Sequence, residues 1–450
     1  MKNKQNIGVF GHYGNKNLGD EAIISSMIEN LLRLLPKAEI SCLSINPFDS
    51  ARRYNVKSFP IRYRADFFKS NNSQAETKVK NDVGPNIENL TTDNNTGKQN
   101  FKKILKSIPV LGFFIKSLAT SISLIKAIKN ECFFLRQAHK FIASIDLLVI
   151  CGSNQLLDNF GGSWGFPYTL LKWTLLGKLT NTKVAFVSVG AGPLTKKLSY
   201  SMLKIALNKA DYISYRDKGS KELIESRIKN LNGGIYPDIA QGLSIKPLSN
   251  EIIEEDIGQL VIGLNPMPVY DKRYWAVPDD EKYKAYTIKM ADLCAEILNL
   301  EYKLKLFITQ VRDADVIDDI LKHLSKDQKY NKWESNIVVV HDETVDGLVS
   351  TITSCDIIIA TRFHATIIPL QLNIPVLGIC YYRKSSEVLS EMGLGDYYVQ
   401  IDDFNIDDLK NKFHNLINNK ELERKKIEIK SAEYRDELNH QYDKILKLIR

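Results

Sequence analysis

The chain has 450 residues, of which 44% are hydrophobic and 25% are charged, a balance too polar for a protein with many membrane spans. Its length predicts two or three domains, because single hydrophobic cores stop growing near about 250–300 residues. A formal net charge of +8 fits partners that carry phosphate or lie on an anionic membrane. The sequence carries no nucleic-acid-binding signature, so we expect no nucleic-acid partner.

The first segment is predicted to be a strand, a loop and a helix. Residues 7–10 form a short apolar run, residues 11–19 are rich in Gly and Asn, and apolar residues then recur at helical spacing until Pro36. Asp20 is expected to cap this helix, and residues 40–45 read as the next strand. Few apolar residues precede the glycines, so no secretory signal is expected and a cytoplasmic location is predicted.

Residues 66–130 are predicted to be an insertion in the first domain. Residues 71–100 are rich in Asn, Lys and Thr and hold too few apolar residues for a core. Residues 101–129 are apolar and basic and contain no Asp or Glu. They fit either helices packed on the core, interrupted near Pro109 and Gly112, or a basic amphipathic helix that lies on a membrane surface.

From residue 145 onward, apolar runs alternate regularly with helical patterns. The expected strands are 147–151, 184–189, 212–215, 259–264, 304–309, 337–341, 357–360 and 376–380. Such alternation predicts parallel sheets covered by helices on both faces.

The least periodic stretch, residues 241–256, is the expected domain boundary. This predicts an α/β protein with a Rossmann-like domain over 1–245, a second over 246–420, and a C-terminal helix over 421–450 that returns to the first domain.

The glycine-rich loop at residues 11–23, GHYGNKNLGDEAI, is the first motif that suggests a ligand. Backbone N–H groups in such a turn, together with a helix start, make a seat for an anion. The spacing matches neither a dinucleotide-binding nor a P-loop motif. The alternative is a purely structural turn. The residues expected to contact a ligand are Gly14, Asn15, Asn17, Asp20 and Glu21.

Three further loops follow predicted strands, where ligands of open α/β sheets bind. Asn154 and Asp158 follow the first and fit sugar hydroxyls, although Asp158 also fits a helix cap. Gly190 and Gly192 follow the second and allow a close approach to the backbone. Arg216 follows the third, where a guanidinium would clamp a carboxylate or phosphate, unless it simply lies exposed beside a capped helix.

The strongest motif runs from Cys355 to Leu394. Arg362 and His364 lie where a buried strand ends and a helix begins, a location that favours anions. The neighbouring strand delivers Arg383 and Lys384 to the same edge of the sheet. Since a His surrounded by three cations at strand ends is more typical of a site than of a core, His364 is predicted to be catalytic.

In this order the motifs resemble the polysaccharide pyruvyltransferase family. The segments that carry the resemblance are GHYGNKNLGDEAI, CGSNQLLD, VSVGAGPL, YRDKGSKEL, YPD and TRFHATIIPLQLNIPVLGICYYRK. The family resemblance implies two Rossmann-like domains that face a cleft, as in glycosyltransferase-B (GT-B) folds. It also implies transfer of pyruvate from phosphoenolpyruvate onto two sugar hydroxyls as a cyclic ketal.

By the same resemblance, His364 is the general acid, and Arg216 and Lys384 bind the donor, with Arg362 and Arg383 beside them. The implied acceptor is a saccharide, commonly lipid-linked, in the synthesis of a capsule or exopolysaccharide. No cofactor or metal is expected, since phosphoenolpyruvate is the co-substrate and the six cysteines form no CxxC pair. The expected location is the cytoplasm, with peripheral membrane contact through residues 101–129.

Two other functions remain open from the sequence. The same architecture serves nucleotide-sugar glycosyltransferases, for which Glu387 or Glu391 would hold the donor ribose. A non-catalytic scaffold would instead use the amphipathic stretch and the charged C-terminal helix.

Overall fold

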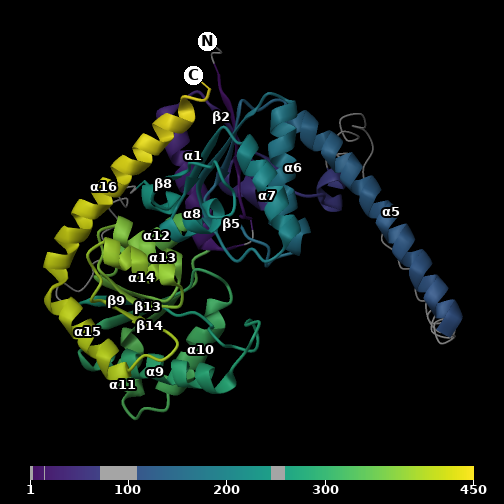
Figure 1. The fold of residues 1–450 in the computed structure, drawn as a ribbon. Coiled ribbons are helices and arrows are strands. Elements are labelled where there is room, and N and C mark those ends of the chain that lie inside the picture. Colours follow the sequence, from purple (N-terminus) through teal and green to yellow (C-terminus); the bar gives the residue numbers. More distant parts are fainter. Residues whose placement is uncertain (1–3, 15, 71–108, 245–258, 450) are drawn as a thin grey trace, which may run out of the picture.

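The computed structural model describes residues 4–14, 16–70, 109–244 and 259–449. Within these ranges the chain forms two parallel β-sheets with helices on their faces (Figure 1). The predicted boundary at 241–256 lies between the last strand of one sheet and the first strand of the other.

The first sheet has the strand order β3-β2-β1-β4-β6-β7-β8, with the short β5 paired to β6. Its strands are β1 (Asn6–Phe10), β2 (Glu39–Ser44), β3 (Lys57–Pro60), β4 (Leu147–Cys151), β5 (Asn154–Leu156), β6 (Lys183–Ala191), β7 (Tyr212–Tyr215) and β8 (Gly234–Ile235). The helices with it are α1 (Leu18–Leu34), α2 (Pro47–Tyr54), α5 (Pro109–Ile142), α6 (Phe166–Leu179), α7 (Lys197–Lys209) and α8 (Lys218–Glu225), and the short 3₁₀ helices are η1 (Gly162–Trp164) and η2 (Ile239–Gly242).

The second sheet has the order β11-β10-β9-β12-β13-β14. Its strands are β9 (Val261–Asn265), β10 (Lys303–Phe307), β11 (Ile337–Val340), β12 (Ile357–Ala360), β13 (Val376–Cys380) and β14 (Tyr398–Gln400). The helices that follow residue 259 are α9 (Asp280–Asn299), α10 (Asp313–Leu324), α11 (Tyr330–Trp333), η3 (Glu334–Asn336), α12 (Val345–Thr353), α13 (Phe363–Gln371), α14 (Arg383–Glu391), α15 (Ile406–Asn418) and α16 (Lys420–Leu446).

All the strands expected from apolar runs are present, and the two-sheet α/β prediction is confirmed. The strands that were not predicted, β3, β5, β8 and β14, have two to four residues, too few for an apolar pattern to emerge. The predicted helix cap is wrong: Asn17 caps α1 by accepting a hydrogen bond from the Gly19 N–H, and Asp20 lies in the first turn.

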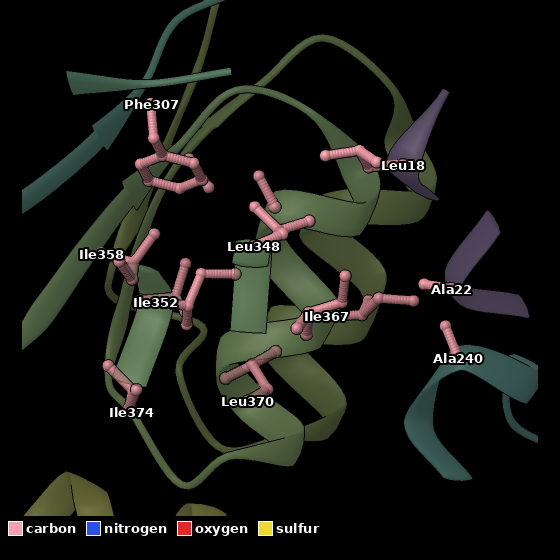
Figure 2. Packing of buried hydrophobic residues seen from close by; sticks show 14 of the residues in the cluster. Leu18, Ala22, Ala240, Phe307, Leu348, Ile352, Ile358, Ile367, Leu370 and Ile374 are labelled. Carbon is pink, nitrogen blue, oxygen red and sulfur yellow. The ribbon is translucent and has the colours of Figure 1, made fainter. Parts of the chain in front are cut away.

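The two domains share one apolar cluster at their junction. Ala22 of α1, Ala240 of η2 and Ile367 and Leu370 of α13 belong to this cluster, and α13 contacts both α1 and η2 (Figure 2). Ile367 and Leu370 are fully buried. Burial of a side chain of this size contributes about 1.5–3 kcal/mol, so this contact fixes α13 against α1.

The C-terminal helix α16 crosses from the second domain back to the first, as expected (Figure 1). Near its end, the Gln441 side chain donates to Ser214 Oγ at 2.7 Å and accepts from Ser188 Oγ at 3.2 Å. Both serines belong to the first sheet. Buried polar contacts of this kind set the position of α16 on the first domain.

The N-terminal part of helix α5 extends away from the rest of the chain (Figure 1), whereas Phe134, Ala138 and Ile142 near its end are buried in the core of the first domain. It begins at Pro109, a position that suits proline because the first N–H of a helix has no partner within it. The expected interruption at Gly112 is wrong, because the helix continues through it to Ile142. Residues 101–108 lie outside the described ranges. No helix in the described ranges is both long enough and apolar enough to cross a bilayer.

Candidate active site

A cavity of about 970 Å³ lies between the two domains, at the carboxyl ends of the strands of both sheets. Loops after β1, β4, β6 and β7 line it from the first domain, and loops after β10, β12 and β13 line it from the second. Parallel sheets bind ligands at this edge, because the loops there point into a common crevice. We refer to this cavity as the cleft.

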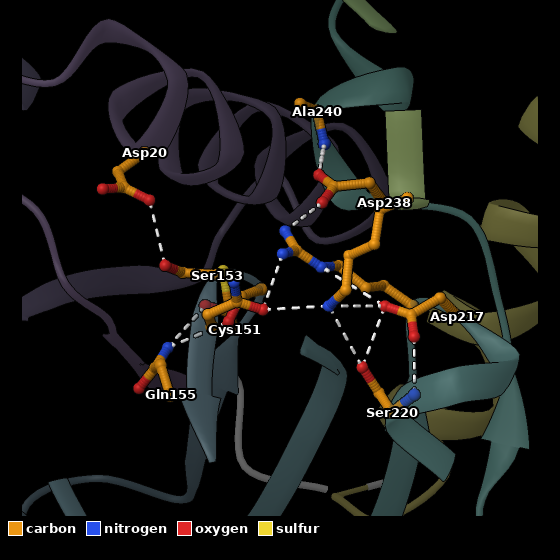
Figure 3. Close-up of polar contacts among 12 residues, drawn as sticks. Asp20, Cys151, Ser153, Gln155, Asp217, Ser220, Asp238 and Ala240 are labelled. Carbon is orange, nitrogen blue, oxygen red and sulfur yellow. Dashed lines mark hydrogen bonds and ion pairs between the residues drawn. The ribbon is translucent and has the colours of Figure 1, made fainter. Parts of the chain in front are cut away.

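Arg216 follows β7 and is held rigidly in the first-domain wall of the cleft. Its guanidinium donates to Asp238 Oδ2 at 2.9 Å and to Asn154 Oδ1 at 2.8 Å, and its side chain is 6% exposed (Figure 3). Its guanidinium carbon also lies 5.0 Å from the centre of the Phe363 ring, across the cleft. The predicted alternative of an exposed Arg216 is therefore wrong.

Gly190 lies directly behind this arginine. A Cβ atom at position 190 would approach Asn154 Oδ1 to 2.4 Å and Arg216 Nε to 2.7 Å. Since such contacts are too short for any side chain, glycine is required for Arg216 and Asn154 to meet. Gly192 lines the cleft itself.

Lys384 reaches across the cleft from α14 to the first domain. Its Nζ atom lies 2.9 Å from Asp217 Oδ2, 3.1 Å from Asn154 Oδ1 and 3.3 Å from Ser220 Oγ. The Asn154 side chain therefore accepts hydrogen bonds from both Arg216 and Lys384. Burial and the nearby Arg216 lower the pKa of Lys384 to about 8, although Asp217 opposes the shift.

Arg362 is the N-cap residue of α13 and lines the second-domain wall. Its Nη2 atom donates to Asp313 Oδ1 at 2.5 Å and its Nε atom to Asp313 Oδ2 at 2.9 Å, which is a bidentate pair with a fully buried carboxylate. The same carboxylate accepts from the backbone N–H groups of Thr309 and Gln310. Asp313 therefore fixes both an arginine and a loop of the cleft.

His364 lies in the first turn of α13, against the first turn of α1. A Cβ atom at Gly19 would lie 2.1 Å from His364 Nδ1, so the two helix starts are in direct contact. Its buried Nε2 atom has no hydrogen-bond partner among the described residues. Burial lowers the pKa of His364; Asp238 and Asp20 act against this lowering, while Arg216 and Arg362 add to it.

Asn17 and Asp20, at the start of α1, were predicted to contact a ligand, and both line the cleft. Asn17 Nδ2 donates to Asp20 Oδ2 at 2.7 Å, and Ser153 Oγ donates to Asp20 Oδ1 at 3.0 Å. Burial opposes ionisation of Asp20, but hydrogen bonds from His12 and Ser153 and the nearby His364 hold its pKa below the usual value. Asp20 is thus an ionised carboxylate in the cleft at neutral pH.

Several predicted site residues lie outside the cleft lining. The Glu21 carboxylate is fully buried and accepts hydrogen bonds from the Gly14 N–H, at 2.7 Å, and from the Tyr54 hydroxyl. Glu21 and Gly14 therefore hold the shape of the loop. Asp158 accepts from the Lys196 N–H at 2.9 Å and fastens the loop before α7. Arg383 is 90% exposed and pairs with Glu387 one helical turn away. Asn15 lies outside the described residues.

The sequence reading missed other residues of the site. Asp238, behind Arg216, is the acid of the YPD segment, and an acid in that segment could have indicated it. Gly19 could have been found as well, because glycine in the first turn of a helix is unfavourable without a close neighbour. Lys16 and Tyr382 also line the cleft and lie within motifs that were singled out, whereas nothing in the local sequence of Arg312 and Phe160 indicated that they do.

The charges of the cleft lining are strongly unequal. Its basic residues are Lys16, Arg216, Arg312, Arg362 and Lys384, whereas Asp20 is the carboxylate among the lining residues that the structure describes. The other carboxylates of the site lie behind the arginines and the lysine. No group of three or more His, Cys, Asp or Glu residues in the described ranges is arranged to hold a metal ion. The cleft is therefore suited to an anion.

The fold and the cleft define a two-domain Rossmann-like protein of the GT-B-like class. The UDP-GlcNAc 2-epimerase from Neisseria meningitidis bound to UDP-GlcNAc aligns with a TM-score of 0.53 and 11% identity, covering 98% of this chain and 99% of that one. The corresponding epimerase from Methanocaldococcus jannaschii gives 0.52 and 12%, covering 91% and 92%. A glycosyltransferase from Rickettsia africae ESF-5 gives 0.52 and 11%, covering 99% of each chain.

The chain belongs to the polysaccharide pyruvyl transferase family, whose model matches residues 17–382. This confirms the resemblance drawn from the motifs and identifies the protein as a transferase. No curated protein matches the chain.

Proposed function

We propose that the protein transfers a pyruvyl group from phosphoenolpyruvate to two hydroxyls of a sugar, forming a cyclic ketal and releasing phosphate. The observation that carries this proposal is the meeting of Arg216 and Lys384, from opposite domains, on the side chain of Asn154. His364 lines the same cavity. Two cations and an imidazole around one pocket suit a donor that carries both a phosphate and a carboxylate.

Donor binding prepares His364 to supply the proton that the reaction needs. Burial keeps the free imidazole mainly neutral, because it lowers the pKa of His364. A bound anion beside the ring favours the charged imidazolium and raises that pKa. His364 therefore takes up a proton as the donor binds and becomes an acid only when the substrate is present.

The bond changes then balance in two steps. His364 gives its proton to the methylene carbon of phosphoenolpyruvate, which becomes a methyl group, while the first sugar hydroxyl forms a C–O bond to the adjacent carbon and loses its proton. The C–O bond to phosphate breaks, and the phosphate departs with its electron pair towards the basic residues. The second hydroxyl adds to the same carbon and closes the ketal; of the two protons that the hydroxyls lose, one returns to His364 and the other goes to the departing phosphate.

The acceptor is proposed to lie at the mouth of the cleft, beside Asp20. The ionised Asp20 carboxylate can accept a hydrogen bond from an acceptor hydroxyl, and Phe160 and Tyr382 offer exposed aromatic rings that suit a sugar face. In this proposal the acceptor is a lipid-linked saccharide of capsule or exopolysaccharide synthesis.

Helix α5 is the proposed contact with the cytoplasmic membrane face. Ile125 and Ile128 are 59% and 55% exposed, and Lys126 and Lys129 lie beside them on the helix. Exposed apolar side chains among lysines suit an anionic lipid surface. The double variant Ile125→Ser/Ile128→Ser is expected to reduce flotation with anionic liposomes, and unchanged flotation would remove the membrane from the proposal.

The proposed reaction is tested by incubating the protein with phosphoenolpyruvate and candidate lipid-linked sugars. The expected result is release of inorganic phosphate, with the ketal mass increment on the sugar by mass spectrometry, and neither with His364→Ala. Release of nucleotide from a sugar nucleotide, without phosphate from phosphoenolpyruvate, would replace this proposal by the glycosyltransferase alternative.

A further inference from the structure

A second cavity, of about 300 Å³, lies at the domain junction away from the cleft. It is bounded by the last turns of α1, by η2, by the end of α13 and by α16. Helix α1 rises about 1.5 Å per residue, so Asp20 in the cleft and Arg33 at this cavity are roughly 20 Å apart. Helices α1 and α13 both begin at the cleft and end at this second cavity, which we call the junction cavity.

Polar atoms in the junction cavity lack partners. Gln371 is 2% exposed, and neither its Nε2 nor its Oε1 atom makes a hydrogen bond with the described residues. Asn373 Oδ1, at the start of the next loop, is also buried without a partner. A buried amide without hydrogen bonds costs free energy, so such a group in a cavity points to something that binds there. The free Oε1 and Oδ1 atoms require a donor, and Nε2 requires an acceptor.

The charge of the junction cavity is positive. Arg33 and Arg435 line it, and the lining includes no Asp or Glu among the described residues. The Arg33 guanidinium is oriented by Asn30 Oδ1 at 3.1 Å and Asn439 Oδ1 at 2.7 Å. Arg435, which is half-buried, makes no ion pair with the described residues. Two guanidinium groups without carboxylates favour a phosphate or a carboxylate.

We propose that the junction cavity binds a small anion that carries hydroxyls, of the sugar phosphate or sugar acid class. The arginines hold the phosphate or carboxylate, and the ligand's hydroxyls donate to Gln371 Oε1 and Asn373 Oδ1. A volume of about 300 Å³ lies at the lower end of the range for small-molecule sites and suits one substituted sugar ring. This inference does not depend on pyruvyl transfer.

Such a ligand would contact both domains and the helix that joins them. Arg33 belongs to the first domain, Gln371 to the second, and Arg435 to α16. A ligand that binds the folded chain in this way raises its melting temperature. Because α13 carries His364 at its other end, the ligand would also hold the catalytic turn of α13 against α1.

Isothermal titration calorimetry on the full chain tests the site, with Lys384→Ala as the background so that anion binding in the cleft is weakened. The probes are glucose 1-phosphate, glucuronate, inorganic phosphate and uncharged glucose. We expect glucose 1-phosphate or glucuronate, or both, to bind with one site per chain, and whichever is tighter identifies the anionic group. Glucose is expected not to bind, and phosphate is expected to bind at least about tenfold more weakly than the sugar phosphate.

Two variants separate binding from folding. Arg435→Gln and Gln371→Leu are each expected to weaken the sugar anion at least about tenfold, while Arg424→Gln, on the same helix but outside the cavity, changes it less than about twofold. Gln371→Leu should also raise the melting temperature, because it removes an unpartnered buried amide.

If neither sugar anion binds, or if binding survives both Arg435→Gln and Gln371→Leu, the proposal is overturned. Equal affinity for phosphate and glucose 1-phosphate would refute the role of the two amides.

Discussion

The arginines of the two cleft walls and the lysine that crosses the cleft are held in different ways. In the first-domain wall, Arg216 is fixed by Asp238 and Asn154 of its own domain. In the second-domain wall, Arg362 is likewise fixed within its domain, by Asp313. Lys384 differs, because each contact of its Nζ with the described residues comes from the opposite domain.

The comparison separates cations that are held within one domain from a cation whose position depends on contact between the domains. Arg216 and Arg362 take their orientation from carboxylates of their own domains. Lys384 takes its position from the first domain, which it contacts across the cleft. His364 behaves similarly, because Gly19 of the first domain packs against its ring. Both walls therefore carry an arginine fixed within its domain, and the second-domain wall also carries the lysine and the histidine that contact the first domain.

The largest effect is expected at the proposed acid, His364, on the second-domain wall. His364→Ala should lower the rate of phosphate release about 10²–10⁴-fold, which is the usual contribution of a positioned general acid. The melting temperature is measured beside the rate, because His364 packs against Gly19 of the first domain and its removal also loosens that contact. His440→Ala, at an exposed position on α16, is the control and should keep full activity. A folded His364→Ala protein with wild-type turnover would contradict the proposed role.

Removing the carboxylate partners of the two arginines one at a time tests whether the arginines have different roles. Asp313→Ala should lower the free energy of unfolding by about 3 kcal/mol, because it leaves the partly buried Arg362 without its charge partner. Asp238→Asn should instead lower kcat/KM for the donor by roughly tenfold or more, because Arg216 loses its orientation. Denaturant unfolding and donor titration of both variants measure the two effects.

The opposite pattern would break the distinction. Donor binding that falls more in Asp313→Ala than in Asp238→Asn would mean that Arg362, and not Arg216, orients the donor.

The sequence predicted the sheets and the α/β class, and eight of the fourteen candidate site residues line the cleft, because apolar runs and strand ends are local features. It could not show that Glu21 and Asp158 hold loops, since their partners, Tyr54 and Lys196, are set by tertiary packing. Arg383 was placed in the site by its neighbour Lys384, but on a helix adjacent residues point about 100° apart. Asp313 and Arg312 lie at the start of a helix with no motif that marks them.

The pH dependence tests whether the crossing lysine binds the donor. The pKa of Lys384 in the free protein is about 8, so its ammonium is charged below this pH and neutral above it. The value of kcat/KM for the donor already falls with rising pH below this value, because the neutral His364 must take up a proton, and the loss of the Lys384 charge should add a further fall of about tenfold per pH unit above about pH 8.

Lys384→Arg provides the matched control, because a guanidinium keeps its charge throughout this range. Its kcat/KM should be lower than that of the wild type but should lack the further decline above pH 8. If the variant shows the same further decline as the wild type, another group is responsible and Lys384 is not the cation that binds the donor.

The smallest effect is expected at Arg383, one residue before the crossing lysine. Its side chain is 90% exposed and pairs with Glu387, an exposed type of pair that is worth about 0–1 kcal/mol at most. Arg383→Gln should change kcat/KM for phosphoenolpyruvate less than about twofold, whereas Lys384→Gln should lower it at least about tenfold. Arg383 and Lys384 share the same loop, the same helix and the same charge, and they differ in whether the side chain crosses the cleft. Equal losses in both variants would show that overall positive charge at this loop, and not the cross-domain contact of Lys384, attracts the donor.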